Sequence, residues 1–399
     1  MVAIIRIEEP FKRPRGPQPP TWKAFLSMAF RPFYLLAALQ GAIAVLFWAF
    51  GFGGTAALPG YLWHGHEMIW GYAGAVIVGF LLTAAATWTG LPPIRGRTLA
   101  ALVVLWLAAR MVLLAVPTSN LWGGALSVLF FVAAALTLAV PIMRSRNRRN
   151  YGVPPLLLAF AAGNLAFHLA AAGLINVDPR HMLHVGLLIV ATVIFFMGLR
   201  VIGFFTSRAL NTPQVTHAPW VAFVAIGAPL AMALLVAVKG PTWLTCIAGV
   251  VGAAINLRQL ARWWHPRVLG QPLLWVLFAG YLCTALGVGL YGLAAFAAPT
   301  LTSAALHSVA VGGIGLLTLG MMSRTALGHT GRPLELPQPM PAAFGCVLAA
   351  TALRLAAALA VPFAHAVLIA SALCFAAGFG LFAYRFGPWL IRPRADGRP

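Results

Sequence analysis

The residues His181-Met-Leu-His-Val-Gly186 open an apolar run centred near residue 193, and this run indicates the class of protein that the chain forms. About 20 consecutive apolar residues make a helix long enough to cross a lipid bilayer. Eleven more runs of this kind are centred near residues 42, 78, 107, 132, 165, 228, 249, 284, 313, 351 and 374. The eighth of the twelve, at 242–257, is the shortest. We therefore predict an all-α, polytopic membrane protein of about twelve transmembrane helices.

The composition of the 399-residue chain excludes a water-soluble globular domain. Hydrophobic residues make up 61% of the chain and charged residues only 8%, whereas a soluble domain carries roughly 25% charged residues. The sequence contains no Ser-His-Asp group, phosphate loop or Walker motif. The four cysteines lack CxxC spacing, and we interpret them as apolar packing residues.

The net charge of +21 follows the membrane topology and does not indicate a nucleic-acid partner. Most of the 27 lysines and arginines lie before the first predicted helix, in alternate connections, or after the last helix. The remaining connections hold only Arg180 and Lys239. Because cytoplasmic connections are enriched in basic residues, we predict a cytoplasmic arm at 1–32, a membrane domain at 33–388 and a cytoplasmic tail at 389–399. The charged arm also argues against a cleavable signal peptide.

Three predicted helices, the second, sixth and tenth, begin with a histidine followed by glycine five positions later. The three pairs are His66 with Gly71, His181 with Gly186, and His307 with Gly312. The first and third copies also end alike, in Thr89-Gly90 and Thr330-Gly331, each 23 residues past its histidine. The spacing suggests three units of four helices. Chance similarity between glycine-rich membrane helices is the alternative.

Histidine is costly inside a bilayer and usually marks a functional site there. Seven of the ten histidines fall in the predicted outer half of the membrane: His64, His66, His168, His181, His184, His307 and His365. We expect one site near the outer surface. Neutral imidazole suits iron, copper and zinc, whereas the scarcity of carboxylates disfavours calcium and magnesium.

Helical spacing determines which of these histidines can face the same site. His181 and His184 are three residues apart and share a helix face, so both can bind one metal, with His168 or His64 as a further ligand. His64 and His66 are two residues apart and cannot both face one site. We predict His66 and His307 as axial ligands of one haem, with His64 as the alternative to His66.

Other residues in the predicted helices fit a haem site but also have structural explanations. Arg110 and Arg354 can pair with haem propionates or can snorkel to the interface. Glycines of the second, sixth and tenth helices can offer a smooth surface to a porphyrin or can allow close helix packing. Glu67 is the only acidic residue inside the predicted helices. We expect it to accept a hydrogen bond from a histidine or arginine, and we assign it a catalytic, proton-relaying role.

The sequence resembles the NnrS family in several blocks. These are Phe30-Arg-Pro-Phe33, Trp63-His-Gly-His-Glu-Met68, Gly79-Phe-Leu-Leu-Thr83 with Trp88-Thr-Gly90, Ala305-Leu-His307, and, most specific, Ser323-Arg-Thr-Ala-Leu-Gly-His-Thr-Gly-Arg-Pro333. A middle block at 196–206 departs from the family pattern, because Leu199 and Gly203 replace a glycine and a proline. We expect this departure to loosen the end of the sixth helix.

The resemblance implies a bacterial inner-membrane protein with twelve helices that contains haem b and copper and acts in the nitric-oxide response. Copper would then be the second metal, which the shared helix face of His181 and His184 leads us to assign to that pair. Its ligand would be nitric oxide or a related small molecule; if it is an enzyme, it would be a haem–copper oxidoreductase acting on nitrogen oxides. The haem–copper oxidases are a weaker analogy, because the seventh helix here lacks their histidine pair. A transporter for a metal, a metal–nitrosyl complex or another small solute is the alternative.

Overall fold

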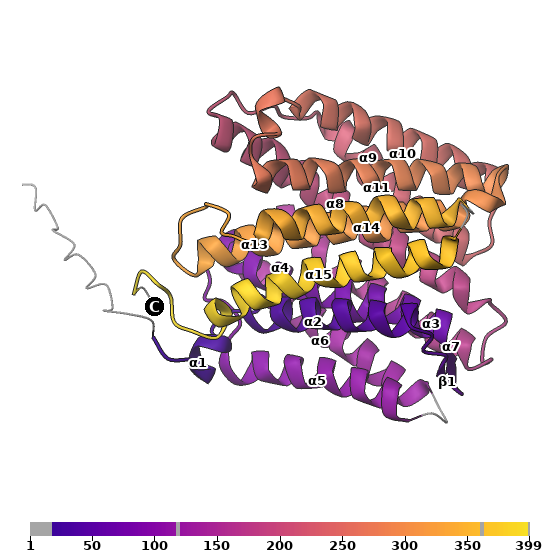
Figure 1. Ribbon diagram of the computed structural model, residues 1–399, viewed down its shortest axis with the longest axis horizontal. Coiled ribbons are helices and arrows are strands. Elements are labelled where there is room, and N and C mark those ends of the chain that lie inside the picture. The colour runs from indigo at the N-terminus through magenta and orange to yellow at the C-terminus, as the bar shows by residue number, and fades with distance from the viewer. Residues whose placement is uncertain (1–17, 117–119, 360–362, 398–399) are drawn as a thin grey trace, which may run out of the picture.

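The computed structural model describes residues 18–116, 120–359 and 363–397 (Figure 1). The basic residues of the predicted arm that precede position 18 lie outside these ranges, and so does Arg398. The described residues include twelve helices long and apolar enough to cross a membrane, which confirms the predicted fold class. Nine of them are α2 (Phe30–Ala49), α5 (Gly96–Ala115), α6 (Leu121–Arg144), α7 (Val153–Ala171), α8 (Pro179–Leu210), α9 (Pro219–Ala237), α10 (Thr242–Trp263), α11 (Pro272–Phe296) and α14 (Met340–Ala358).

The second, tenth and twelfth spans complete the set. The second consists of α3 (Gly60–His66), the π-helical segment η1 (Glu67–Ala73) and α4 (Gly74–Thr89). The tenth consists of α12 (Thr302–His307), the π-helical segment η5 (Ser308–Gly315) and α13 (Leu316–His329), and the twelfth is α15 (Ala364–Leu390). Smaller elements are α1 (Trp22–Phe25), the 3₁₀ turns η2 (Arg148–Asn150), η3 (Pro266–Val268) and η4 (Pro299–Leu301), and a hairpin of β1 (Gly54–Thr55) and β2 (Leu58–Pro59).

The spans form one bundle whose first and last helices pack together. α15 lies against α2, and the amide of Thr21 donates to the carbonyl of Ile391 at 3.0 Å. Arg31 at the start of α2 donates to the carbonyls of Leu390 and Arg392. Figure 1 shows α1 and the C-terminal end on the same side of the bundle. The two described ends of the chain are therefore tied together at one face.

The three expected units of four helices are in contact with one another. α6 packs against α7 and α10 packs closely against α11, so contacts cross each expected boundary. The spans that carry the histidine motif instead meet in the interior, where α8 contacts both η1 and η5. This arrangement brings the motif helices together, as a shared site requires.

The two π-helical segments distinguish the second and tenth spans from the sixth. η1 begins directly after His66 and η5 directly after His307, whereas α8 continues as α-helix past His181. Single-turn π segments are rare and are frequent at functional sites. Both spans also end in a left-handed glycine, Gly90 (φ 69°) or Gly331 (φ 73°). The likeness of the first and third motif copies therefore extends to the backbone.

Two expectations about helix ends need correction. α10 does not stop near residue 257 but continues to Trp263, because Asn256 is buried and its amide donates to the carbonyls of Ala225 and Gly252. α8 is also not loosened at its end and runs unbroken to Leu210. Gly203 makes room for the indole of Trp263, since a Cβ there would lie 2.7 Å from the ring nitrogen.

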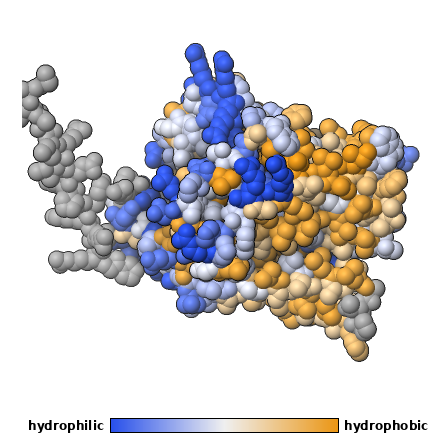
Figure 2. Space-filling view, turned by 90° about the horizontal axis from the view of Figure 1, so that it is seen from above, coloured by the Kyte–Doolittle hydropathy of each residue, from blue (hydrophilic) through white to orange (hydrophobic). Residues whose placement is uncertain are grey.

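The surface is amphipathic along the bundle. Figure 2 shows hydrophilic residues gathered toward the end that carries the chain termini, and hydrophobic residues over most of the remaining surface in that view. The exposed hydrophobic residues, such as Phe223 on α9 and Ile247 on α10, lie on the outside of spanning helices. Such a surface is suited to lipid contact, because apolar side chains lose nothing by facing acyl chains.

Candidate functional site

A cavity of about 290 Å³ lies between α2, α3, η1, α8, α12, η5, α14 and α15. Its lining is mostly apolar, with Trp48, Met68, Leu187 and Phe375 among the contributors. The strongly polar lining residues are three histidines and two arginines: His64, His184, His307, Arg180 and Arg354. Few polar groups on a mostly apolar wall are typical of cofactor and small-molecule sites.

Backbone contacts fix the ring orientation of His307. Its Nδ1 lies 2.7 Å from the carbonyl oxygen of Ser303. A carbonyl can only accept, so Nδ1 carries the proton and Nε2 keeps its lone pair. This is the arrangement found in metal-binding histidines, in which one ring nitrogen donates to an oxygen and the other binds the metal. His307 is therefore prepared to act as a ligand within the cavity.

His64 reaches the same cavity from the second span. Its ring stacks on Trp48 with centroids 5.3 Å apart and planes inclined by 20°. Its Nδ1 is buried and finds no hydrogen-bond partner among the described residues. Arg354 is close enough to interact electrostatically with both His64 and His307. The cavity thus places two imidazoles and a guanidinium around one apolar space.

The two cavity arginines differ in their ion-pair and hydrogen-bond partners. Arg180 forms an exposed ion pair with Asp178, with 2.6 Å between Nη2 and Oδ2, and its hydrogen bonds lower the pKa of the Asp178 carboxyl. Arg354 has one weak contact, a 3.3 Å hydrogen bond from Nη2 to the hydroxyl of Ser303. Arg354 is consequently the freer partner for a carboxylate at the cavity.

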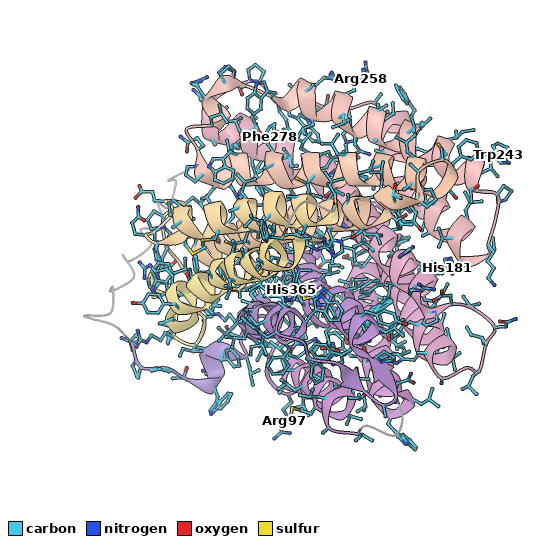
Figure 3. All side chains as sticks on the ribbon, turned by 45° about the vertical axis from the view of Figure 1, so that its right-hand side comes forward. Arg97, His181, Trp243, Arg258, Phe278 and His365 are labelled. Carbon is cyan, nitrogen blue, oxygen red and sulfur yellow. The ribbon has the colours of Figure 1, made fainter. Side chains whose placement is uncertain are left out.

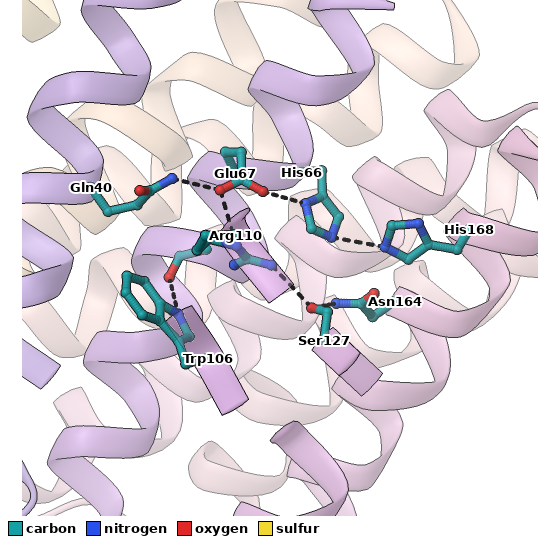
Figure 4. Close-up of polar contacts among 9 residues, drawn as sticks. Gln40, His66, Glu67, Trp106, Arg110, Ser127, Asn164 and His168 are labelled. Atoms are coloured by element: carbon teal, nitrogen blue, oxygen red, sulfur yellow. Dashed lines mark hydrogen bonds and ion pairs between the residues drawn. The ribbon is translucent and has the colours of Figure 1, made fainter. Parts of the chain in front are cut away.

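His66 does not line this cavity but belongs to a separate buried network (Figure 4). Its Nδ1 lies 2.9 Å from Glu67 Oε1, and its Nε2 lies 3.1 Å from Nε2 of His168 on α7. With Glu67 ionised and both rings neutral, His66 donates through Nδ1 and accepts through Nε2. His168 then donates through Nε2 and keeps its lone pair on Nδ1, which has no partner among the described residues.

Glu67 is the anchor of this network. Gln40 donates to its Oε2 at 2.5 Å, and Arg110 Nε lies 3.2 Å from the same oxygen. Arg110 Nη2 donates to the hydroxyl of Ser127 at 3.3 Å. The expectation that Glu67 pairs with a histidine or an arginine is confirmed, since it pairs with both. A carboxylate and a guanidinium this deep in the protein tolerate burial only as a pair.

The expectation of one histidine site is therefore wrong. His64 and His307 share the cavity, His66 and His168 share the Glu67 network, and His365 is exposed. Arg110 is held by Glu67 in the network, not at the cavity. The two-residue spacing of His64 and His66 does send them to different places, as helical geometry required.

The pair on α8 is brought together but without a third ligand. The rings of His181 and His184 have centroids 6.2 Å apart, and His184 Nδ1 lies 3.0 Å from the hydroxyl of Tyr291. Among the described residues, no group of three or more histidine, cysteine or acidic side chains is placed to hold a metal ion. His168, the proposed further ligand, faces His66 instead.

The glycines of the motif helices pack against protein, which confirms the helix-packing interpretation. Substitution by a larger residue would place a Cβ about 2.7 Å from Trp70 at Gly186, 2.7 Å from Cys283 at Gly312, and 2.5 Å from Phe131 at Gly74. Gly71 makes room for the ion pair itself, because a Cβ there would lie 2.9 Å from Glu67 Oε2. None of these four offers open space to a porphyrin.

Sequence reasoning missed the amides and the hydroxyl that complete the network. Gln40 binds Glu67, and Asn164 donates to Ser127 at 2.9 Å. A signal was present, because amide side chains are rare in apolar runs and an intramembrane polar residue is a candidate for a buried hydrogen bond.

Gly124 on α6 gives a test of how tightly the network is held. A Cβ at this position would lie 2.4 Å from Cγ of His168, closer than atoms pack. We expect Gly124→Ala to displace the His168 ring and to destabilise the protein by about 1–3 kcal/mol, as overpacking does. Thermal unfolding of the detergent-solubilised protein measures this loss. Gly227→Ala is the control, because a Cβ there meets nothing within 4 Å. Equal melting temperatures for the two variants would contradict the prediction.

Comparison with known proteins decides the family. Residues 24–394, nearly the whole chain, match the family described as NnrS protein. The chain belongs to the NnrS family. Among curated proteins, none matches this sequence. Membership supports a multi-pass membrane protein of the nitric-oxide response, and the sequence resemblance is thereby confirmed.

The NnrS blocks that carried the resemblance meet in the structure. The ring of Phe30 lies 5.5 Å from that of His329, and the Phe30 amide donates to the hydroxyl of Thr83 at 3.0 Å. Three blocks far apart in the sequence thus converge at the end of the bundle opposite the cavity. The other blocks supply His64, His66, Glu67 and His307, so the family pattern covers both the cavity and the network.

Proposed function

We propose that the cavity binds haem b through His307 and His64, and that this haem captures nitric oxide or converts it or a product of it. The observation that carries the proposal is the fixed tautomer of His307, which leaves a lone pair on Nε2 in a residue that lines an apolar cavity. Within this proposal, the expected pairing of His66 with His307 gives way to the alternative, His64 with His307.

The residues around the cavity fit a haem. His64 and His307 come from different spans and would hold the haem between them. Nδ1 of His64 is buried and has no hydrogen-bond partner among the described residues. Arg354 is available for a propionate, and guanidinium groups bind carboxylates well. Bound haem would supply an iron centre, and a small gas would bind it in place of one of the two imidazoles. The protein residues would hold it, exclude water and admit apolar nitric oxide from the bilayer.

The Glu67 network supports the same proposal from a distance. Glu67 directly follows His66 and lies in the same helical turn as His64. It would hold this part of the second span rigid, so that His64 stays at the cavity. Its catalytic, proton-relaying role remains a prediction.

We propose the inner membrane of a bacterium as the location, with both termini cytoplasmic and the cavity toward the periplasm. The charge asymmetry of the connections supports this orientation.

An optical spectrum of the purified, detergent-solubilised protein tests the function. We expect a Soret band that shifts when nitric oxide is added to the reduced protein. A transporter would instead move its solute in proteoliposomes without any haem. A haem-free protein that still protects cells from nitric oxide, after expression with added haem precursor, would overturn the proposal.

Copper at His181 and His184 is a separate proposal, supported by their adjacent rings and by the position of His184 in the cavity lining. We expect the double variant His181→Ala/His184→Ala to lose copper while keeping the haem spectrum. Elemental analysis of the purified protein measures both metals. His217→Ala/His265→Ala is the control, since these histidines lie in connections away from the cavity. Full copper content in the first variant would contradict the assignment.

A further inference from the structure

A second, larger groove lies on the outer surface of the bundle and shares no lining residue with the histidine cavity. It encloses about 610 Å³ between α10, the connection after it, α11 and α14. Its floor includes Leu260 and Phe278, both buried, and its walls include Trp264, Leu282 and Leu348, all partly exposed. Every side chain that lines it is apolar or aromatic. The groove therefore suits a hydrocarbon chain and no polar ligand.

The groove reaches from one membrane interface toward the middle of the bilayer. α10 ends at Trp263 and α11 begins at Pro272, so the connection between them marks the interface. Leu282 is ten residues into α11, which corresponds to a depth of about 15 Å at the rise of an α-helix. That depth is about half of a bilayer core of roughly 30 Å. Trp264 and Trp275 stand at the interfacial end, where tryptophan is favoured.

Three exposed arginines lie on the segments that form the interfacial end of the groove. Arg258 and Arg262 lie on the last turns of α10, and Arg267 lies in the turn η3, two residues before the groove residue Leu269. Figure 3 shows Arg258 and Phe278 in the same upper part of the bundle. The ion pairs among the described residues join other side chains, so these three guanidinium groups are unpaired there.

We propose that this groove holds an acyl chain of an anionic phospholipid, whose phosphate is bound by Arg258, Arg262 and Arg267. The apolar groove accounts for the chain, and the unpaired cations at its interfacial end account for the headgroup. Basic pockets between transmembrane helices bind anionic headgroups for this reason. A second copy of this chain is a poor occupant, because it would bring two arginine clusters of like charge together.

Native mass spectrometry of the detergent-solubilised protein tests the proposal, with an equimolar mixture of phosphatidylglycerol and phosphatidylcholine as the probe. We expect the wild-type protein to retain phosphatidylglycerol selectively. Each arginine near the headgroup contributes about fivefold to anionic lipid binding, so Arg258→Gln/Arg262→Gln/Arg267→Gln should lower the apparent affinity on the order of 100-fold. Ala279→Phe fills the groove. It should therefore lower the retention of phosphatidylglycerol, although the variant keeps all three arginines.

A matched control removes the same charge elsewhere. Arg144→Gln/Arg146→Gln/Arg148→Gln neutralises three exposed arginines around the α6–α7 connection and should leave lipid retention unchanged. Three results would overturn the proposal. They are equal retention of the two lipids by the wild type, undiminished phosphatidylglycerol on the first triple variant, or an Ala279→Phe protein that changes only the ratio of monomer to dimer.

Discussion

Replacing His307 by alanine should remove the haem spectrum of the purified protein or convert it to a five-coordinate form. The reason is that His307 alone in the cavity has its Nδ1 proton committed to a backbone carbonyl and its other nitrogen free. The substitution removes the ligand but not the fold, because the His307 side chain makes no other hydrogen bond to the described residues. Optical spectra of wild type and variant, with haem measured by extraction, give the result. Added imidazole should restore part of the Soret band by occupying the vacated space.

Two companion variants make this prediction specific. His64→Ala should behave like His307→Ala, whereas His66→Ala should keep the haem, because His66 faces His168 and not the cavity. A spectrum lost in His66→Ala and retained in His64→Ala would return the axial role to His66. An unchanged spectrum in His307→Ala would rule out the haem site in this cavity.

The second large effect is expected at Glu67. Glu67→Gln leaves Arg110 as a buried charge without a counter-ion, and breaking a buried pair in this way costs about 3–5 kcal/mol. The variant should therefore melt well below the wild type in detergent. Arg110 is buried and 3.2 Å from the carboxylate, so water cannot replace the lost partner.

The double variant Glu67→Gln/Arg110→Met distinguishes the effect of the lost ion pair on stability from the effect of changed side-chain packing. Removing both charges should recover much of the stability, because a buried pair replaced by apolar groups of similar volume is often neutral. Arg180→Gln is the control, since Arg180 forms an exposed ion pair, which contributes about 0–1 kcal/mol. A double variant no more stable than Glu67→Gln would show that the pair is not the source of the loss.

The fold was predictable from sequence because membrane insertion leaves few choices. Backbone groups in hydrocarbon must be hydrogen-bonded within the helix, so each apolar run of about 20 residues became a span. One error lay where a polar residue extends a helix, as Asn256 does in α10 by donating to the carbonyl of Ala225. The other was the expected loosening of α8, which runs unbroken to Leu210. The π-helical segments were not predictable, because Glu67–Ala73 and Ser308–Gly315 have no residue pattern that marks them.

The candidate site was predictable in its residue types but not in its grouping. The cost of polar groups in lipid singled out His64 and His307, which line the cavity, and Glu67, which anchors the buried network. The position of a residue across the membrane did not reveal which of these side chains are in contact. Their contacts depend on the rotation of each helix about its axis and on how the helices pack. The space that Gly124 leaves for His168, for example, directs that ring to His66 and away from α8. Such contacts come from helices distant in sequence and leave no local pattern.

The matched π-helical segments also bear on the ancestry of the chain. A π turn is a helix that has accepted one extra residue, and an equal distance of 23 residues from histidine to Thr-Gly requires that both spans accepted it. Two independent insertions at the same place are a less economical history than one insertion followed by duplication. That history would make the second and tenth spans copies of one ancestral helix. The cavity is lined by both spans, and each contributes one histidine, His64 or His307.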